Sequence, residues 1–179
     1  MSLTVATLVP GLILLALGFP LVLAHDGAIA ALKSFPRSST AAGAFFGAGA
    51  VWFLYRIWHL SPADFGDYRV LLFVAFAAIA VLAFRRVPDF LAVRGLCILV
   101  LVGAMPLLDA AYMQYDHPQR LFMVSLVYLA VALAIWIGAQ PWRLRDFFGW
   151  LFARPARIRT LGACLAVYGL LLCIAAFTY

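Results

Sequence analysis

The chain has 179 residues, of which 67% are hydrophobic and only 11% are charged, and its net charge is +6. Soluble domains have roughly 45–50% apolar and about 25% charged residues, and a soluble core of this size could not bury so much apolar surface. The apolar runs are continuous, whereas a β-barrel would alternate apolar and polar residues. The composition therefore excludes an ordinary soluble protein and predicts an all-α integral membrane protein.

Six apolar runs approach or exceed the length that crosses a hydrocarbon core of about 30 Å at about 1.5 Å per residue. They cover residues 3–24, 40–58, 68–84, 93–113, 120–139 and 160–177. We expect the first run to be a retained helix and not a signal peptide, because it lacks a basic beginning and is long for a signal sequence. The runs predict one transmembrane domain over residues 1–179.

The basic residues indicate how these spans are oriented. The loops after the first, third and fifth runs hold ten Lys and Arg residues, and the rest of the chain holds three. Because Lys and Arg near membrane segments are retained in the cytoplasm, the pattern predicts three hairpins that turn on the cytoplasmic side, with both termini outside. We expect the cell's inner (plasma) membrane. The three turns resemble one another, so an internal triplication stands beside the alternative of three unrelated hairpins.

The last of these loops, residues 141–159, mixes aromatic and basic residues. Rings and aliphatic side chains in such a segment can sink to the headgroup level while the basic groups reach phosphate and water. We expect an interfacial amphipathic segment that contacts lipid headgroups. Its candidate contacts are Arg143, Arg145, Arg154, Arg157 and Arg159.

The second span begins with a small-residue motif in which Gly43 and Gly47 are four residues apart, each followed by alanine. Small residues on one face of a membrane helix let a second helix approach closely. Gly43 and Gly47 are therefore candidate helix-packing residues, toward either a helix of the same chain or one of another subunit.

Two ionisable residues are candidates for a pair within the membrane. Asp109 precedes the end of the fourth run, where a carboxylate is costly unless it is paired or functional, and Arg56 stands at the matching end of the second run. We predict an ion pair that locks the two spans together. A proton or ion path, or simple extension of both side chains to the interface, are the alternatives.

Few residues suggest chemistry. His59, Asp116 and His117 are weak candidates for a metal site, because they lie on separate loops or are adjacent in sequence. No catalytic or nucleotide-binding motif is present, and no pair of histidines suits a haem. We therefore predict no cofactor and no nucleic-acid partner. Whether the chain is an enzyme stays open, although the sequence favours a protein without catalytic activity.

The leading functional hypothesis is a non-catalytic membrane subunit or oligomeric scaffold, in contact with lipids and with other subunits or copies of itself. It rests on a chain made almost entirely of spans and short loops, with little surface outside the bilayer for a substrate. The first alternative is a small transporter or channel with a path between helices or subunits. The second is an intramembrane enzyme that acts on a lipid or a quinone.

Overall fold

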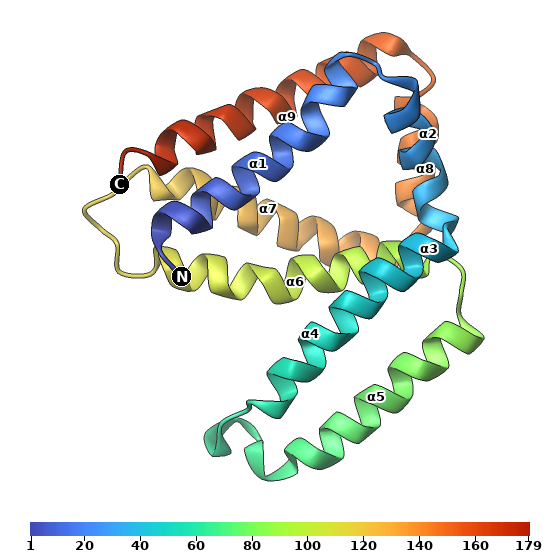
Figure 1. Ribbon diagram of the computed structural model, residues 1–179, viewed down its shortest axis with the longest axis vertical. Helices are drawn as coiled ribbons and strands as arrows, with labels where there is room; N and C mark the ends of the chain where they lie inside the picture. Colours follow the sequence, from blue (N-terminus) through green and yellow to red (C-terminus); the bar gives the residue numbers. More distant parts are fainter. The chain divides into compact units, whose positions relative to one another are not determined.

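The computed structural model describes residues 1–179, and all of its regular elements are helical (Figure 1). The longer ones are α1 (Leu3–Val22), α2 (Asp26–Ser34), α4 (Gly47–Trp58), α5 (Arg69–Arg86), α6 (Leu91–Ala111), α7 (Arg120–Ala139), α8 (Trp142–Leu151) and α9 (Pro155–Ala176). The short ones are η1 (Phe35–Arg37), α3 (Ser39–Ala41), the π-helix η2 (Ala42–Phe46), η3 (Pro62–Asp64) and η4 (Gly66–Tyr68). Five helices, namely α1, α5 with η4, α6, α7 and α9, are long and apolar enough to cross a membrane. The prediction of an all-α protein with several membrane-length helices is therefore confirmed.

The second predicted span, residues 40–58, is helical but is not a uniform α-helix. The elements α3, η2 and α4 follow one another without a break from Ser39 to Trp58. The π-helical turn between them is wider than an α-helical turn, a rare local form that usually has an identifiable packing or functional cause. This span does not count among the five membrane-length helices, so the six-span, three-hairpin arrangement stays a prediction.

The chain divides into two compact units, which we describe separately. The first contains Met1–Lys33, Gly103–Leu133 and Arg145–Tyr179, and the second contains Ser34–Val102 and Ala134–Leu144. The long helices α6 and α7 therefore contribute residues to both units. The single transmembrane domain expected from the sequence stays a prediction.

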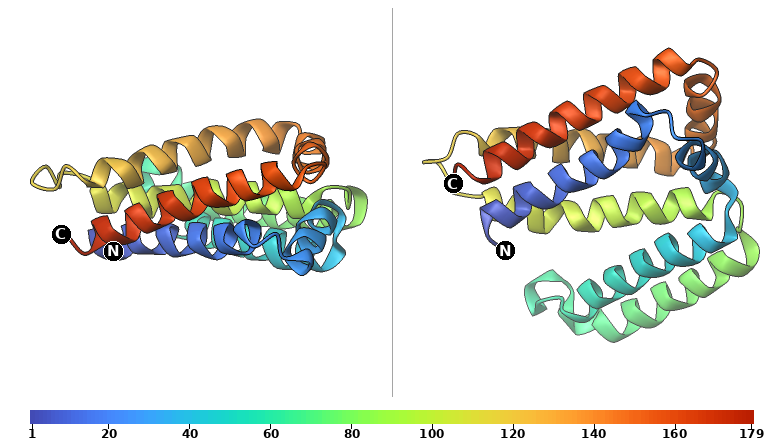
Figure 2. Two further views of the ribbon diagram at one scale, coloured as in Figure 1. Left: turned by 90° about the horizontal axis from the view of Figure 1, so that it is seen from above. Right: turned by 45° about the horizontal axis from the view of Figure 1, so that its top comes forward.

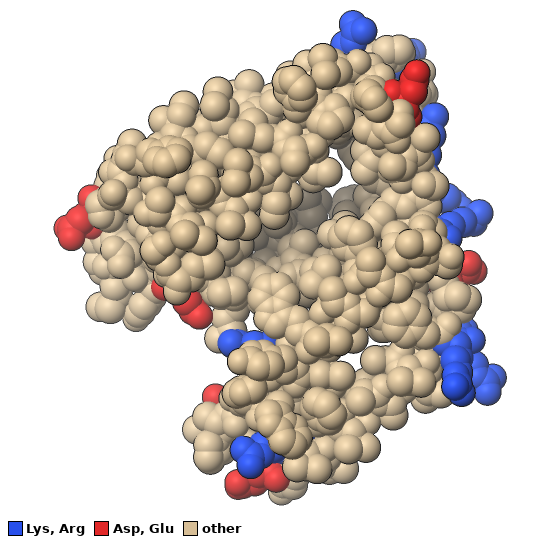
Figure 3. Space-filling view, in the orientation of Figure 1, with Lys and Arg blue, Asp and Glu red and all other residues tan.

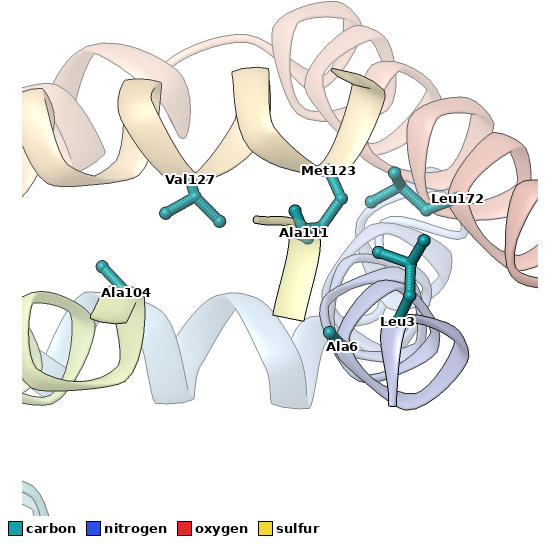
Figure 4. Packing of buried hydrophobic residues seen from close by; sticks show 7 residues of the cluster. All are labelled: Leu3, Ala6, Ala104, Ala111, Met123, Val127 and Leu172. Atoms are coloured by element: carbon teal, nitrogen blue, oxygen red, sulfur yellow. The ribbon is translucent and has the colours of Figure 1, made fainter. Parts of the chain in front are cut away.

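The core of the first unit lies where α1, α6, α7 and α9 meet (Figure 4). Its buried residues are Leu3, Ala6, Ala104, Ala111, Met123, Val127 and Leu172. Three of them are alanines, which lets the helix backbones lie close together while Met123 and Leu172 fill the remaining space. Lipid is as apolar as these side chains, so close packing and not exclusion of water stabilises this core within a membrane.

A glycine-lined contact joins α1 to α9, which run in opposite directions side by side (Figures 1 and 2). Gly11 and Gly18 of α1 lie opposite Gly169 and Gly162 of α9. A methyl group at Gly18 would lie 2.7 Å from a backbone nitrogen of α9, and one at Gly162 would lie 2.6 Å from a backbone nitrogen of α1. Only glycine permits this approach, and residues seven apart return to nearly the same helix face. The two pairs therefore fix how α1 and α9 pack.

A single glycine has the same role in the second unit. A methyl group at Gly95 of α6 would lie 2.2 Å from the backbone nitrogen of Phe46 and 2.6 Å from the carbonyl carbon of Phe45. Both phenylalanines belong to the π-helical turn η2. Gly95 therefore brings the backbone of α6 directly against this turn.

Helix α5 packs on α4 and on the end of η2 through aromatic side chains and buries none of its own residues. Each pair meets edge to face, with ring centroids 5.1–5.4 Å apart: Phe46 with Phe84, Phe53 with Phe76, and Trp58 with Phe73. Such pairs add about 0.5–1.5 kcal/mol each beyond the area they bury. The rest of α5 exposes apolar side chains, as a helix in contact with lipid or with another protein does.

Candidate functional site

The basic segment predicted over residues 141–159 forms helix α8 and the first turn of α9. The break between the two helices lies at residues 152–154, and Pro155 begins α9, where its missing N–H costs no hydrogen bond. Gly149 lies inside α8 and does not end it. The segment is thus a short helix followed by the beginning of a membrane-length one.

The five candidate headgroup arginines have different surroundings. Arg157 donates to the Trp150 carbonyl oxygen at 2.7 Å, and its guanidinium lies 4.3 Å from the Trp150 ring centroid, so it holds the end of α8. Arg145 is paired with Asp146 at 2.8 Å. Arg143, in the second unit, lies 4.9 Å from the Trp136 ring centroid. The other two, Arg154 and Arg159, are exposed. Lipid contact stays a prediction for all five.

A second short helix, α2, accompanies α8, although the apolar runs of the sequence leave residues 25–39 in a loop. In the views of Figures 1 and 2, α2 and α8 lie side by side and across the direction of α1 and α9. Ile29 and Leu32 of α2 pack with Phe148 of α8 around the buried residues Leu21 and Leu151. The apolar spacing of Ile29 and Leu32, followed by Lys33, is a helical signal that a search for long apolar runs overlooks.

Basic side chains mark this end of the first unit. In Figure 3 they gather near α2, α8 and the beginning of α9, whereas the visible lengths of α1 and α9 present almost entirely uncharged residues. This distribution suits helices that cross an apolar layer and short helices that lie at its surface.

The small-residue face of the second span has no close neighbour. A methyl group added at Gly43 or at Gly47 would meet no atom within 4 Å. The adjacent Ala44 and Ala48 are exposed. Close helix contacts inside the chain are made instead by Gly95 in this unit and by the glycines of α1 and α9 in the other. Helix packing at Gly43 and Gly47 stays a prediction.

The predicted ion pair joins residues of different units, Arg56 of the second and Asp109 of the first, and it stays a prediction. Asp109 is exposed and stands two residues before the end of α6. A carboxylate in the last turn of a helix is disfavoured by the negative end of the helix dipole. A nearby cation would offset this unfavourable interaction.

The weak metal candidates have other contacts. His59 Nδ1 donates to the Tyr55 carbonyl oxygen at 2.8 Å, and the His117 ring meets the Tyr179 ring edge to face with centroids 5.4 Å apart. Asp116 is exposed. No group of three or more His, Cys, Asp or Glu side chains is close enough to hold a metal ion.

A buried polar contact in the first unit was not foreseen from the sequence. The hydroxyl of Thr7, the only buried polar side chain, donates to the Leu3 carbonyl oxygen at 3.0 Å and is hydrogen-bonded to the Tyr179 hydroxyl at 3.2 Å. The contact ties the beginning of α1 to the residues that follow α9. No local pattern predicts it, because its partners are 172 residues apart.

No family model, curated protein or solved structure matches the chain. Its function is therefore inferred from its own residues.

Proposed function

We propose that this protein is a non-catalytic integral membrane subunit that assembles, through the face of η2 and α4 bearing Gly43 and Gly47, with another membrane polypeptide or with copies of itself. We call this surface the glycine face. It comprises Gly43, Ala44, Gly47 and Ala48.

The single observation that carries the proposal is that nothing lies within 4 Å of a methyl group built at either glycine. Lipid contact accounts for an apolar surface but gives no reason for glycine, which costs about 1 kcal/mol relative to alanine inside a helix. Close approach of another helix does give a reason, because small residues let membrane helices pack backbone to backbone. Where glycine packs inside this chain, at Gly18, Gly95 and Gly162, an added methyl group would clash with a neighbouring backbone.

The second unit offers further surface for such a partner. Helix α5 buries none of its residues, and its exposed apolar side chains include Val74, Ile79 and Leu82. We expect the six-span arrangement, with α2 and α8 on the cytoplasmic side and both termini outside, because the basic residues concentrate there.

Site-specific photo-cross-linking in native membranes tests the proposal. A photo-reactive amino acid at Ala44, on the glycine face, should form a discrete adduct with one polypeptide, which mass spectrometry identifies as a copy of this chain or as a partner. The control position is Val167 of α9, which is 67% exposed and belongs to the other unit. Similar adducts from both positions, or none from Ala44, would contradict the proposal.

The predicted pair of Arg56 and Asp109 is tested separately by a double-mutant cycle of unfolding free energies. Arg56→Gln and Asp109→Asn should show a coupling above about 0.5 kcal/mol, because contacting residues are not additive. Additive effects would exclude the ion pair while leaving assembly through the glycine face untouched.

A further inference from the structure

An open pocket of about 330 Å³ lies in the first unit between its two short helices. Its lining residues are Lys33 from α2, and Arg145, Phe148, Gly149, Phe152 and Ala153 from α8 and the turn that follows it. Two cationic groups and two aromatic rings therefore share one pocket, and two small residues keep its floor open. A methyl group at Gly149 would meet no atom within 4 Å.

The charges around the pocket favour an anion. The Lys33 ammonium lies 5.5 Å from the Phe152 ring centroid, so it is held over an apolar surface that does not neutralise it. Arg145 donates to Asp146 through Nε at 2.9 Å and Nη2 at 2.8 Å. One carboxylate cannot balance two cations, so the pocket keeps a net positive charge. A phosphate group, which accepts hydrogen bonds from both kinds of cation, is the complementary ligand.

The surroundings of the pocket favour a phosphate that belongs to a lipid. On α8, the exposed rings of Phe147 and Trp150 are stacked with centroids 6.0 Å apart. Exposed Trp side chains are enriched at the headgroup level of a membrane. The pocket itself is lined by the rings of Phe148 and Phe152, which pack against the buried residues Leu21 and Leu151. These side chains offer acyl chains an apolar surface beside the pocket.

We propose that this pocket binds the headgroup of an anionic phospholipid, with Lys33 and Arg145 as the phosphate ligands and with the acyl chains along the aromatic side chains of α8. Lys33 was not among the residues that the sequence suggested for this role. The inference does not depend on assembly through the glycine face, which lies in the other unit.

Native mass spectrometry of the full chain, extracted in a neutral detergent and titrated with phosphatidylglycerol or phosphatidylcholine, tests the proposal. The unsubstituted protein should retain phosphatidylglycerol in preference to phosphatidylcholine. The variant Lys33→Gln/Arg145→Gln should bind phosphatidylglycerol about tenfold more weakly. Both basic residues attract an anionic headgroup, but Arg145 is shared with Asp146, so we expect a tenfold effect for the pair, which corresponds to about 1.4 kcal/mol.

A matched control removes two other charges. Arg85→Gln/Arg86→Gln changes two exposed arginines at the end of α5, in the other unit, and should leave the affinity for phosphatidylglycerol unchanged. Asp146→Asn should act in the opposite direction and tighten binding, because the carboxylate competes with phosphate for Arg145. An equal loss of affinity for phosphatidylglycerol in the two double variants would show that positive charge alone attracts the lipid. That result would overturn the proposed binding site.

A free phosphate would satisfy the same two cations, and a second measurement separates this source from a lipid. Phosphatidylglycerol should raise the unfolding temperature of the detergent-solubilised chain, whereas inorganic phosphate should not, because it has no acyl chains to contact the aromatic side chains of α8. Equal stabilisation by inorganic phosphate, lost in Lys33→Gln/Arg145→Gln, would overturn the lipid assignment.

Discussion

Replacement of Gly95 by alanine should destabilise the second unit, because α6 meets the π-helical turn at this residue. The new methyl group would lie 2.2 Å from the Phe46 nitrogen and 2.5 Å from its Cα atom. Non-bonded carbon atoms normally stay about 3.5–4.0 Å from their neighbours. The nearest atoms are backbone, so no side-chain rotation can relieve the clash, and α6 or η2 must move.

The expected magnitude follows from two opposing terms. Overpacking of a well-packed interior costs about 1–3 kcal/mol, and a clash with backbone belongs at the upper end of this range. Alanine regains up to about 1 kcal/mol over glycine through its higher helix propensity. The net loss in the free energy of unfolding should therefore be about 2 kcal/mol.

Titration of the detergent-solubilised chain with sodium dodecyl sulfate, followed by tryptophan fluorescence, measures this loss. The matched control is Gly138→Ala on α7, in the same unit, where the new methyl group would lie 3.6 Å from the Cys97 Cβ atom, an ordinary contact. The control should unfold at the same or a slightly higher detergent fraction than the unsubstituted protein. If Gly95→Ala and Gly138→Ala unfolded together, the close contact between α6 and the π-helical turn would be refuted.

Three further predictions concern the first unit. Gly18→Ala should lower the free energy of unfolding by about 1–3 kcal/mol in the same titration, because its methyl group would lie 2.7 Å from a backbone nitrogen of α9; unchanged stability would contradict the glycine contact. A double-mutant cycle of Thr7→Val and Tyr179→Phe should give a coupling of about 0.5–1.5 kcal/mol from their hydrogen bond, and additive effects would exclude it. Arg157→Gln should speed hydrogen exchange at the end of α8, where Arg157 bonds the Trp150 carbonyl oxygen; equal exchange rates would argue against this cap.

The long helices were predictable because their signal is local and strong. A run of about 20 apolar residues has few alternatives to a membrane helix, and the predicted 120–139 coincides with α7. The beginning of α9 was less predictable. The helix starts at Pro155, five residues before the predicted 160. The prediction began too late because the beginning of the helix contains Arg157 and Arg159, which interrupt the apolar run.

The helix contacts were harder to predict because they depend on residues far apart in the chain. The motif around Gly43 and Gly47 is the local pattern that a sequence search recognises, yet the close contacts within the chain are made elsewhere. Gly11 and Gly18 carry a usable signal, a spacing of seven residues that recurs between Gly162 and Gly169. The spacing indicates a helix contact only once the two pairs are known to face each other. Gly95 has no repeat at all.

The candidate lipid pocket was foreseen only in part. The interleaved aromatic and basic residues around Arg145 predicted an interfacial amphipathic segment that is separate from the long spans. The short helix α8 lies within this segment. The sequence did not connect Lys33 with these residues, because Lys33 is more than a hundred residues away from Arg145. It also lies on a helix that is too short to be recognised as a membrane span. The pocket exists only when α2 and α8 lie together.

The mass of the gently extracted native particle tests the central claim, assembly through the glycine face, most directly. We predict a particle larger than the 19.6 kDa chain after subtraction of detergent and lipid, with stoichiometric copies or partner polypeptides. Gly43→Ile/Gly47→Ile should reduce it to a single chain that still folds, because a Cβ atom at either position meets no atom of the rest of the chain within 4 Å. A native particle that contains one chain alone would contradict the account.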